Sequence, residues 1–498
     1  MKNIILTTIN AKWIHPSLAL RLLKANLRGL EESCLIMEFA LRQKLSEKVE
    51  PLLAALAPAK RSPQDGALSR RTKILGVSVS IWNHLATIEL LRELEKASLE
   101  IKPVIVMGGP EVSRLPPDAG IFQFADFVIR GEGETAFRTL CEEIFDKQQE
   151  QPAWDRQRKP RFIDAGYADV REIKSAYHLY EEEDTLKKLT YVEASRGCPF
   201  NCEFCQSAGD NAVREFPIET FLAGMDALIQ RGARKFKFLD RSFNVNIERS
   251  LKIMEFFLDK ITRSGAPLVV HFEMVPSIFP PELLRTLSRF PPGTLRLEIG
   301  IQSLNPRITA LIKRPSNPEK ELETIRSLRE KTNAVIHADL IAGLPGEDLV
   351  SFAKSFDSLW LALRKTNKTS SETFTDARVE IQPGILKLLP GTPISRHSEA
   401  FGMRYNSLPP YEVEETSAMS ASDIKRVKNF ARFWEVIVNR RLARADDFAG
   451  ENAVFENFME LSDSLFAHFG RNWGIDKSEL TEAVKSFSKT ASLRFALF

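Results

Sequence analysis

The sequence lacks the features that mark secreted, membrane-spanning and DNA-binding proteins. Its 5 cysteines are an odd number, with three close together, so a disulfide framework is not indicated and a reducing, cytoplasmic setting is expected. No apolar run approaches the ~20 residues of a membrane span, and the N-terminal MKNIILTTIN does not resemble a secretory signal. A net charge of +3 over 498 residues is no basic excess, so no DNA partner is expected.

What remains is the composition of an ordinary globular protein. Hydrophobic residues make up 43% of the chain and charged residues 27%. A length of 498 residues predicts two or three separate cores, because single domains rarely grow so large.

The first 150 residues alternate short apolar runs with amphipathic stretches, the pattern of a parallel sheet covered by helices. We therefore expect an α/β domain at residues 1–150, with a Rossmann-like (flavodoxin-like) parallel sheet. Strands are predicted at Asn3–Ile9, Cys34–Ala40, Lys73–Ile81, Pro103–Gly108 and Phe127–Gly131.

The last three of these strands end in small or polar residues. Open α/β sheets bind ligands beyond the carboxyl ends of their strands, so these turns predict a small-molecule crevice. The candidate residues are Ser78, Ser80, Gly108, Gly109, Gly131 and Glu132.

A polar, proline-containing stretch at 151–162 interrupts the periodicity and predicts a linker over residues 151–187. Six further strand patterns separated by helical stretches predict a partial (β/α)6 barrel at residues 188–400. These strands are expected at Leu189–Ala194, Lys235–Leu239, Leu268–Met274, Thr294–Ile301, Ala334–Ile341 and Arg378–Pro383. Residues 401–498 are predicted to be a helical C-terminal region, with amphipathic stretches at 424–442 and 479–495.

The chemistry is expected on the loop after the first barrel strand, where Cys198, Cys202 and Cys205 have C-x3-C-x2-C spacing. A 4Fe-4S cluster ordinarily takes four thiolates, but Cys34 and Cys141 fall in the preceding domain. Three thiolates leave one iron open. An open iron can chelate the amino and carboxylate groups of S-adenosylmethionine, with the sulfonium placed for one-electron cleavage to a 5'-deoxyadenosyl radical.

Two other interpretations of the three cysteines remain. A zinc site favours paired C-x2-C units or a closing histidine, and no histidine lies near this loop in the sequence. A cluster that only carries electrons would be expected to have a fourth cysteine.

Residues 188–395 resemble the radical S-adenosylmethionine superfamily. The resemblance rests on the cysteine loop with its aromatic Phe204, on EIGIQSLNPRITALIKR at 298–314 and on DLIAGLPGED at 339–348. It implies S-adenosylmethionine contacts at Phe204, Asp240, Asn244, Glu273, Gln302, Ser303, Arg314, Gly343 and Gly346. Purely structural roles would also explain some of these residues: the two glycines are suited to a turn, and Arg314 is suited to a helix end.

An α/β domain before a radical barrel resembles the cobalamin-binding class of this superfamily, which implies that the N-terminal crevice binds cobalamin. The Asp-x-His-x-x-Gly loop that supplies a lower cobalt ligand in many cobalamin proteins is absent. His15 follows the first strand but is better explained as a packing residue. Trp13 and Trp82 lie at strand ends, where they could cover a flat macrocycle or belong to the core.

Three hypotheses follow. The first is a cobalamin-dependent radical enzyme that catalyses methyl transfer or a rearrangement, with a reductant such as flavodoxin or ferredoxin. The second is a radical enzyme without cobalamin, and the third is a non-catalytic iron–sulfur redox or binding protein. A methylthiotransferase is disfavoured because that family has a second cysteine triad, which the two other cysteines cannot form.

Overall fold

The computed structural model describes residues 2–57, 72–97, 99, 102–147, 159–210, 212–265, 268–363, 379–443 and 453–490. Residues 151–158 of the expected linker, Arg378 of the last expected strand and residues 491–495 of the last expected helix lie outside the described residues. The chain divides into two compact units. The first comprises Met1–Arg196 and Arg214–Leu239, and the second comprises Gly197–Val213 and Asp240–Phe498.

The first unit contains a six-stranded parallel sheet in the order β2-β1-β3-β4-β5-β6. Its strands are β1 (Ile4–Asn10), β2 (Cys34–Ala40), β3 (Ile74–Ser78), β4 (Val104–Gly108), β5 (Phe127–Gly131) and β6 (Arg161–Gly166). The order of the first five strands is the flavodoxin-like order, so the fold expected for this region is confirmed.

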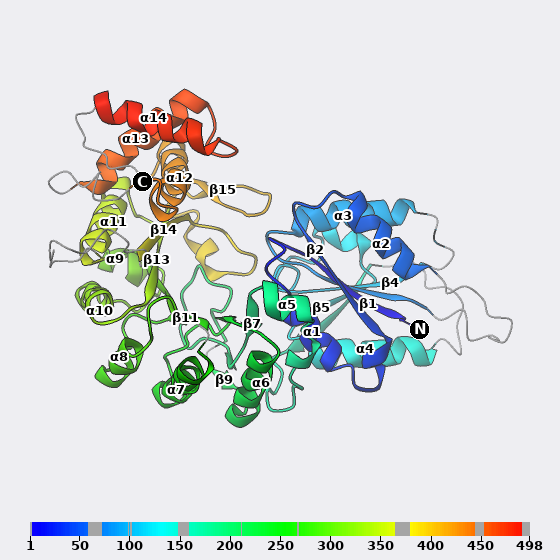
Figure 1. The fold of residues 1–498 in the computed structure, drawn as a ribbon. Helices are drawn as coiled ribbons and strands as arrows, with labels where there is room; N and C mark the ends of the chain where they lie inside the picture. Colours follow the sequence, from blue (N-terminus) through cyan, green and yellow to red (C-terminus); the bar gives the residue numbers. More distant parts are fainter. Residues whose placement is uncertain are drawn as a thin grey trace. The chain divides into compact units, whose positions relative to one another are not determined.

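Helices cover both faces of this sheet (Figure 1). α2 (Ser46–Leu56) and α3 (His84–Lys96) pack on one face against residues such as Ile5 and Leu75. α1 (Leu18–Ala25) and α4 (Glu134–Lys147) pack on the other face against Ile4 and Ile74. Because successive strand residues point to opposite faces, a sheet covered on both sides needs apolar residues at nearly every position. This explains the continuous apolar runs of the sequence.

One segment expected to be a linker belongs to the N-terminal sheet instead. Arg161–Gly166 forms β6, which pairs in parallel with β5. Phe162 packs against the core on one face of the sheet, and Ile163 and Ala165 pack against the core on the other. The segment was misjudged because an edge strand is half exposed, and its alternating polar residues resemble a linker.

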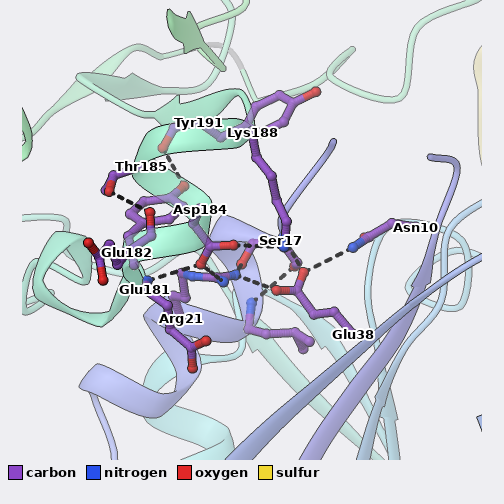
Figure 2. A network of polar contacts seen from close by, with 12 residues as sticks. Asn10, Ser17, Arg21, Glu38, Glu181, Glu182, Asp184, Thr185, Lys188 and Tyr191 are labelled. Carbon is purple, nitrogen blue, oxygen red and sulfur yellow. Dashed lines mark hydrogen bonds and ion pairs between the residues drawn. The ribbon is translucent and has the colours of Figure 1, made fainter. Parts of the chain in front are cut away.

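The chain after β6 is also tied into the first unit, through the network in Figure 2. The buried Arg21 guanidinium on α1 forms ion pairs with Glu38 (2.7 Å) and Asp184 (2.6 Å). Asp184 lies in α5 (Glu182–Lys187) and also pairs with Lys188 at 2.9 Å. Residues 182–187 of the expected linker, together with Lys188 after it, are therefore held by buried charge pairs.

The six strands expected after the linker all form, within a few residues of the predicted positions. In the first unit, β7 (Thr190–Val192) pairs in parallel with β10 (Lys235–Phe238). In the second unit, β11 (Val269–Met274), β12 (Leu295–Gln302), β13 (Val335–Ala342) and β14 (Val379–Ile385) form parallel pairs in chain order. This is the second parallel sheet of the expected α/β architecture.

The helices between these strands are α6 (Ile218–Gln230), α7 (Ile247–Ser264), α8 (Pro281–Ser288), α9 (Pro306–Leu311), α10 (Pro318–Lys331) and α11 (Leu349–Leu363). Short elements complete the described chain: η1 (Arg28–Ser33), η3 (Gly120–Phe124), η4 (Tyr177–Leu179), β8 (Ser195–Arg196), β9 (Arg214–Glu215), η5 (Pro393–His397), β15 (Arg404–Tyr405) and β16 (Val413–Glu415).

The C-terminal region contains the expected helices, but residues 401–420 of the expected helical region carry the short strands β15 and β16 instead. The helices are α12 (Ala421–Trp434), the π-helical η6 (Glu435–Asn439), α13 (Val454–Phe469) and α14 (Lys477–Thr490). Phe430 and Trp434 of α12 are buried and stack with their rings 5.7 Å apart. Phe356 of α11 packs edge-on against Trp434 at 4.8 Å. This apolar stretch is therefore core. Within the described residues, no helix is long and apolar enough to cross a membrane.

Candidate active site

The three clustered cysteines lie on the loop Gly197–Val213 of the second unit. Gly197 is required at the base of this loop. Its φ is +95°, and a Cβ there would lie 2.0 Å from the carbonyl oxygen of Ala212. The backbone N–H of Cys205 donates to the carbonyl of Cys202 at 3.0 Å, which closes a tight turn between these two thiols.

A hydrogen-bond donor lies near each of the three sulfur atoms. Ser242 Oγ is 3.9 Å from Cys198 Sγ, and Arg314 Nη1 is 4.0 Å from Cys202 Sγ. The backbone N–H of Ser207 donates to Cys205 Sγ at 3.4 Å. Burial raises the pKa of the Cys202 thiol above its ordinary value, and the positive charge of Arg314 offsets this only in part. These surroundings suit sulfur that carries negative charge, as it does when it ligates iron.

All three cysteines line one pocket of the second unit. Among the described residues, no three His, Cys, Asp or Glu side chains converge on a point where a metal ion could bind. The two observations are compatible, because each thiolate of a 4Fe-4S cluster binds a different iron. The donor set therefore fits the cluster that the spacing predicts.

Part of the remaining pocket wall comes from β11, β12 and β13, the strands at whose carboxyl ends the functional groups of parallel β/α folds gather. Among the predicted cofactor contacts, the lining includes Phe204, Glu273, Gln302 and Arg314. The structure therefore brings these four residues together with the cysteines.

Arg314 connects the cysteine loop to β12. Besides its approach to Cys202, its guanidinium donates to the carbonyl oxygen of Gly300. Gln302 ends β12 beyond a register shift and has a φ of +69°, a left-handed conformation that is costly for a residue with a side chain. Strained backbone of this kind is concentrated at functional sites, which agrees with the position of Gln302 in the pocket wall.

Five predicted contacts do not line the pocket: Asp240, Asn244, Ser303, Gly343 and Gly346. The fully buried Asn244 shapes the pocket wall instead, because its amide donates to the carbonyl of Val275 (3.0 Å) and accepts from the N–H of the same residue (2.7 Å). Ser303 donates to the buried Glu347 at 2.5 Å. A cofactor role for these residues stays a prediction.

Packing accounts for the two glycines of the turn after β13. Gly343 has a φ of +83°, and a Cβ there would lie 2.5 Å from the Val413 side chain. Gly346 has a φ of +73° and lies against Phe401. A glycine is needed at both positions whether or not an adenosyl group lies nearby.

The sequence reasoning missed four charged residues that line the pocket: Arg241, Glu298, Glu321 and Asp339. Glu298 could have been found, because it alternates with buried leucine and isoleucine in β12 and must point to the opposite face of the sheet. Glu321 had no such signal, since it lies in an ordinary charged helix pattern. It is fully buried, and burial raises its pKa.

Below the pocket, the same face of the sheet continues as a polar row. His271 Nε2 lies 3.2 Å from a carboxylate oxygen of Glu298, and His337 Nδ1 lies 3.0 Å from one of Glu380. The two imidazole rings stack 5.6 Å apart. Barrel interiors are usually filled with branched apolar side chains, so this row marks the face as one that contacts polar groups.

In the first unit, strand pairing brings the expected crevice residues together. Ser78 at the end of β3 pairs with Gly108 at the end of β4. The hydroxyl of Ser113 accepts a hydrogen bond from the N–H of Gly131 (3.2 Å) and donates to the carbonyl of Gly109 (2.8 Å). The N–H of Ser80 is bound to Asn83. These contacts order the strand-end turns, and a cobalamin role for the six candidates stays a prediction.

Two exposed tryptophans follow the strands of this crevice. Trp13 is 47% exposed and Trp82 is 51% exposed, so neither belongs to the core. Trp82 donates to the carbonyl of Ile9 at 3.2 Å, near the end of β1. Large exposed indoles at strand ends fit the flat, partly apolar face of a macrocycle. His15 is bound to the Tyr191 hydroxyl at 2.9 Å, which agrees with its interpretation as a packing residue.

Glu132 belongs to an ion-pair cluster rather than to an open crevice. Its carboxylate pairs with Arg214 at 2.7 Å and with Arg196 at 3.1 Å. Arg196 also pairs with Glu134 (2.6 Å) and Glu193 (3.0 Å). Burial alone would raise the pKa of Glu132, but the hydrogen bond from Arg214 and the charge of Arg196 hold it below its ordinary value. These ion pairs join residues of three separate segments of the first unit.

Comparison with known proteins agrees with this geometry. Residues 192–359, which contain the cysteine loop and β11 to β13, match the family model of the Radical SAM superfamily. This chain carries a radical S-adenosylmethionine domain. The matched range ends before the C-terminal helical region and begins after the N-terminal sheet.

Proteins similar to this chain include a 2-(S-pantetheinyl)-carbapenam-3-carboxylate methyltransferase of Streptantibioticus cattleyicolor. It is 24% identical over 321 residues, which are 57% of this chain and 44% of the relative. The structure of OxsB, a cobalamin-dependent S-adenosylmethionine radical enzyme, aligns with 98% of this chain and 75% of its own, at 16% identity and a TM-score of 0.60.

The structure of the radical methyltransferase TsrM from Kitasatospora setae covers 82% of this chain and 79% of its own, at 17% identity and a TM-score of 0.55. At these identities the structural likeness establishes the fold alone. The chain also spans only 44% and 58% of the first two curated relatives, so their activities do not transfer directly.

Proposed function

We propose that this chain is a cobalamin-dependent radical S-adenosylmethionine methyltransferase that transfers a methyl group to a substrate not yet identified. The observation that carries the proposal is the single pocket that brings three thiols together with Arg314 and several carboxylates. Methyl transfer is favoured over rearrangement because the carbapenam enzyme and TsrM are named as methyltransferases. Cobalamin is favoured by the resemblance in fold to OxsB and by the exposed Trp13 and Trp82.

Within this proposal, Cys198, Cys202 and Cys205 ligate three irons of a 4Fe-4S cluster. A cluster bound by these three thiolates would supply the one-electron reduction that cleaves S-adenosylmethionine. The guanidinium of Arg314 offers positive charge beside Cys202 and, as part of the pocket lining, a partner for a carboxylate of the ligand. Glu273, Glu298 and Asp339 offer acceptors for ligand hydroxyl and ammonium groups.

Phe200 and Phe204 provide the apolar part of the pocket lining near the cysteines. Such walls reduce the access of water, which protects reactive species and strengthens the electrostatic contacts of the pocket. No residue of the pocket is assigned as a proton donor or acceptor to substrate.

Iron and cobalt per chain test the proposal first, in protein purified without oxygen from cells supplied with cobalamin. We expect about four irons and about one cobalt. The same protein is then incubated with a strong reductant and S-adenosylmethionine labelled in its methyl group, and 5'-deoxyadenosine is quantified. Formation of 5'-deoxyadenosine supports the radical chemistry. An intact cluster that cleaves no S-adenosylmethionine would favour the non-catalytic iron–sulfur protein.

The missing Asp-x-His-x-x-Gly loop favours a second candidate, a radical enzyme that needs no cobalamin. Four irons and 5'-deoxyadenosine without stoichiometric cobalt, and without a response to added cobalamin, would establish this alternative. The N-terminal crevice would then need another role.

A further inference from the structure

Glu203, the residue after the second cysteine, is a nearly fully buried carboxylate that contacts three basic side chains. Its side chain is 1% exposed. Arg396 reaches it with Nε at 2.9 Å and with Nη2 at 2.9 Å, and His397 Nε2 lies at 2.8 Å. Lys313 Nζ completes the set at 3.2 Å. None of the sequence motifs required an acid at this position.

The backbone of Glu203 is also bound on both sides. Its N–H donates to the carbonyl of Ile312 at 2.9 Å, and its carbonyl accepts from the N–H of Ile394 at 3.0 Å. A single residue therefore joins the cysteine loop, the turn at 312–314 and the start of η5. All three segments belong to the second unit.

The turn that Glu203 contacts carries the arginine beside Cys202. Lys313 has a φ of +49°, a left-handed conformation that is costly for lysine and persists only where neighbouring contacts enforce it. Arg314 follows directly, and its guanidinium lies 4.0 Å from Cys202 Sγ. Glu203 thus fixes the position of Cys202 through the backbone that they share. It fixes the position of Arg314 through its ion pair with the adjacent Lys313.

Stability alone is a poor explanation for such a cluster. Removing charges from water costs free energy that the ion pairs recover only with good geometry, and a well-packed apolar group often serves stability equally well. A buried carboxylate that is paired with cations from two other segments does, however, fix the relative positions of the segments that carry these charges. The segments fixed here include one cluster ligand and its neighbouring cation.

We propose that Glu203 is a positioning residue that sets the cysteine loop, and Cys202 in particular, in the cluster-binding geometry before iron arrives and that slows iron loss afterwards. The inference rests on the proposed function only in assuming that the three cysteines ligate a cluster. Outer partners that orient metal ligands typically change metal affinity 10–100-fold when they are removed.

Glu203→Gln is the main test, because glutamine keeps the size of the side chain but removes the charge. Arg404→Met is the control, since Arg404 is an exposed arginine of the same unit that pairs with Glu415 far from the loop in sequence. Both variants and the wild-type chain are reconstituted with iron and sulfide without oxygen. The rate of iron loss to a chelator is then followed by visible absorption.

We expect iron loss from Glu203→Gln to be about tenfold faster than from the wild type, with Arg404→Met unchanged. A second readout uses the metal-free chain, in which alkylation of each cysteine is measured by mass spectrometry with the buried Cys34 as an internal reference. Alkylation of Cys202 should accelerate in Glu203→Gln. Equal rates of iron loss and alkylation in Glu203→Gln and the wild type would overturn the proposal.

Arg396→Met provides the same test if Glu203→Gln does not fold, because the Arg396 side chain is 54% exposed and its loss leaves the core intact. Faster iron loss from this variant supports the proposal, and an unchanged rate contradicts it. Arg396→Lys, which keeps the charge, should fall between Arg396→Met and the wild type. A wild-type chain that binds no cluster would refute the proposed function, whereas a stable cluster in every variant would refute only the role of Glu203.

Discussion

The two parallel sheets of this protein differ in what their faces carry. In the first unit, every residue of β1 is buried, and helices cover both faces. In the second unit, strands such as β11 alternate between buried apolar residues and partly exposed polar ones, including His271 and Glu273. The first sheet can therefore offer a ligand only the turns at its strand ends. The second also offers the side chains of one whole face.

The difference explains why the two candidate sites are not equally developed. The pocket of the second unit combines strand side chains, such as Glu298, with a loop that carries three thiols. In the first unit, the strand-end residue Glu132 is committed to ion pairs with two arginines. Radical chemistry is accordingly the better supported half of the proposal, and cobalamin binding depends on backbone turns and on two exposed tryptophans.

Replacing one thiol should have the largest effect and should be confined to the second unit. We expect Cys202→Ala to lose the cluster, with iron near zero and no 5'-deoxyadenosine, because two thiolates cannot hold the cluster in place. Cys141→Ala, in the core of the first unit, is the matched control and should retain full iron content. Iron content and anaerobic product analysis decide this, and wild-type iron in Cys202→Ala would refute the assignment.

Removing Arg196 should lower the stability of the first unit. The guanidinium is 10% exposed and pairs with three glutamates, so Arg196→Met removes the cation that these carboxylates share, although Glu132 keeps its pair with Arg214. We expect a loss of about 3–5 kcal/mol in the free energy of unfolding. Hydrogen exchange of peptides from β1 to β5 provides the measurement.

Arg171→Met is the control for this change, because Arg171 is an exposed arginine that pairs only with its neighbour Asp169 among the contacts described. Its unfolding should match that of the wild type. If Arg196→Met were as stable as this control, the ion-pair cluster would not hold the first unit together.

Glu347 should give the second unit a pH dependence of stability. Burial raises the pKa of Glu347 to about 7, and Ser303 donates to its carboxyl group. A carboxyl group with a raised pKa in the folded state stabilises the fold fully below its ordinary pKa of 4.5, and this contribution is lost as the pH rises through about 7.

The free energy of unfolding of the wild type should therefore fall between pH 5 and pH 8 by up to about 3 kcal/mol relative to Glu347→Gln, which cannot ionise. Chemical denaturation at the two pH values measures the difference. If the free energies of unfolding of the wild type and Glu347→Gln changed equally between the two pH values, the fold would not keep Glu347 neutral.

The smallest effect on stability is expected at the crevice of the first unit. Trp82→Ala removes a side chain that is 51% exposed, so the free energy of unfolding should change by less than about 1 kcal/mol. Cobalt content should fall while iron stays at the wild-type level. An unchanged cobalt content would show that Trp82 does not contact cobalamin. If the iron content fell as much as the cobalt content, the substitution would affect both sites, and the two sites would not be independent.

Much of the fold was predictable because its signals are local. Continuous apolar runs indicated the covered sheet, and the flavodoxin-like strand order followed. The half-exposed β6 was missed because its alternation resembles a linker, and only pairing with β5 identifies it as a strand. At the site, spacing identified the cysteines. The sequence could not show that Gln302 lines the pocket whereas its neighbour Ser303 donates to Glu347 instead.

The sequence by itself determined the alternation of strands and the spacing of three cysteines on which the proposed iron–sulfur chemistry depends, because both are properties of neighbouring residues. The tertiary structure alone decided which distant charges meet. Glu203 and Arg396 are separated by 193 positions yet form an ion pair whose carboxylate is buried, and Arg314 lies beside Cys202 although 112 positions separate them. The physical reason is that burial and electrostatic contact depend on distance in space, and only the packed strands and loops establish that distance.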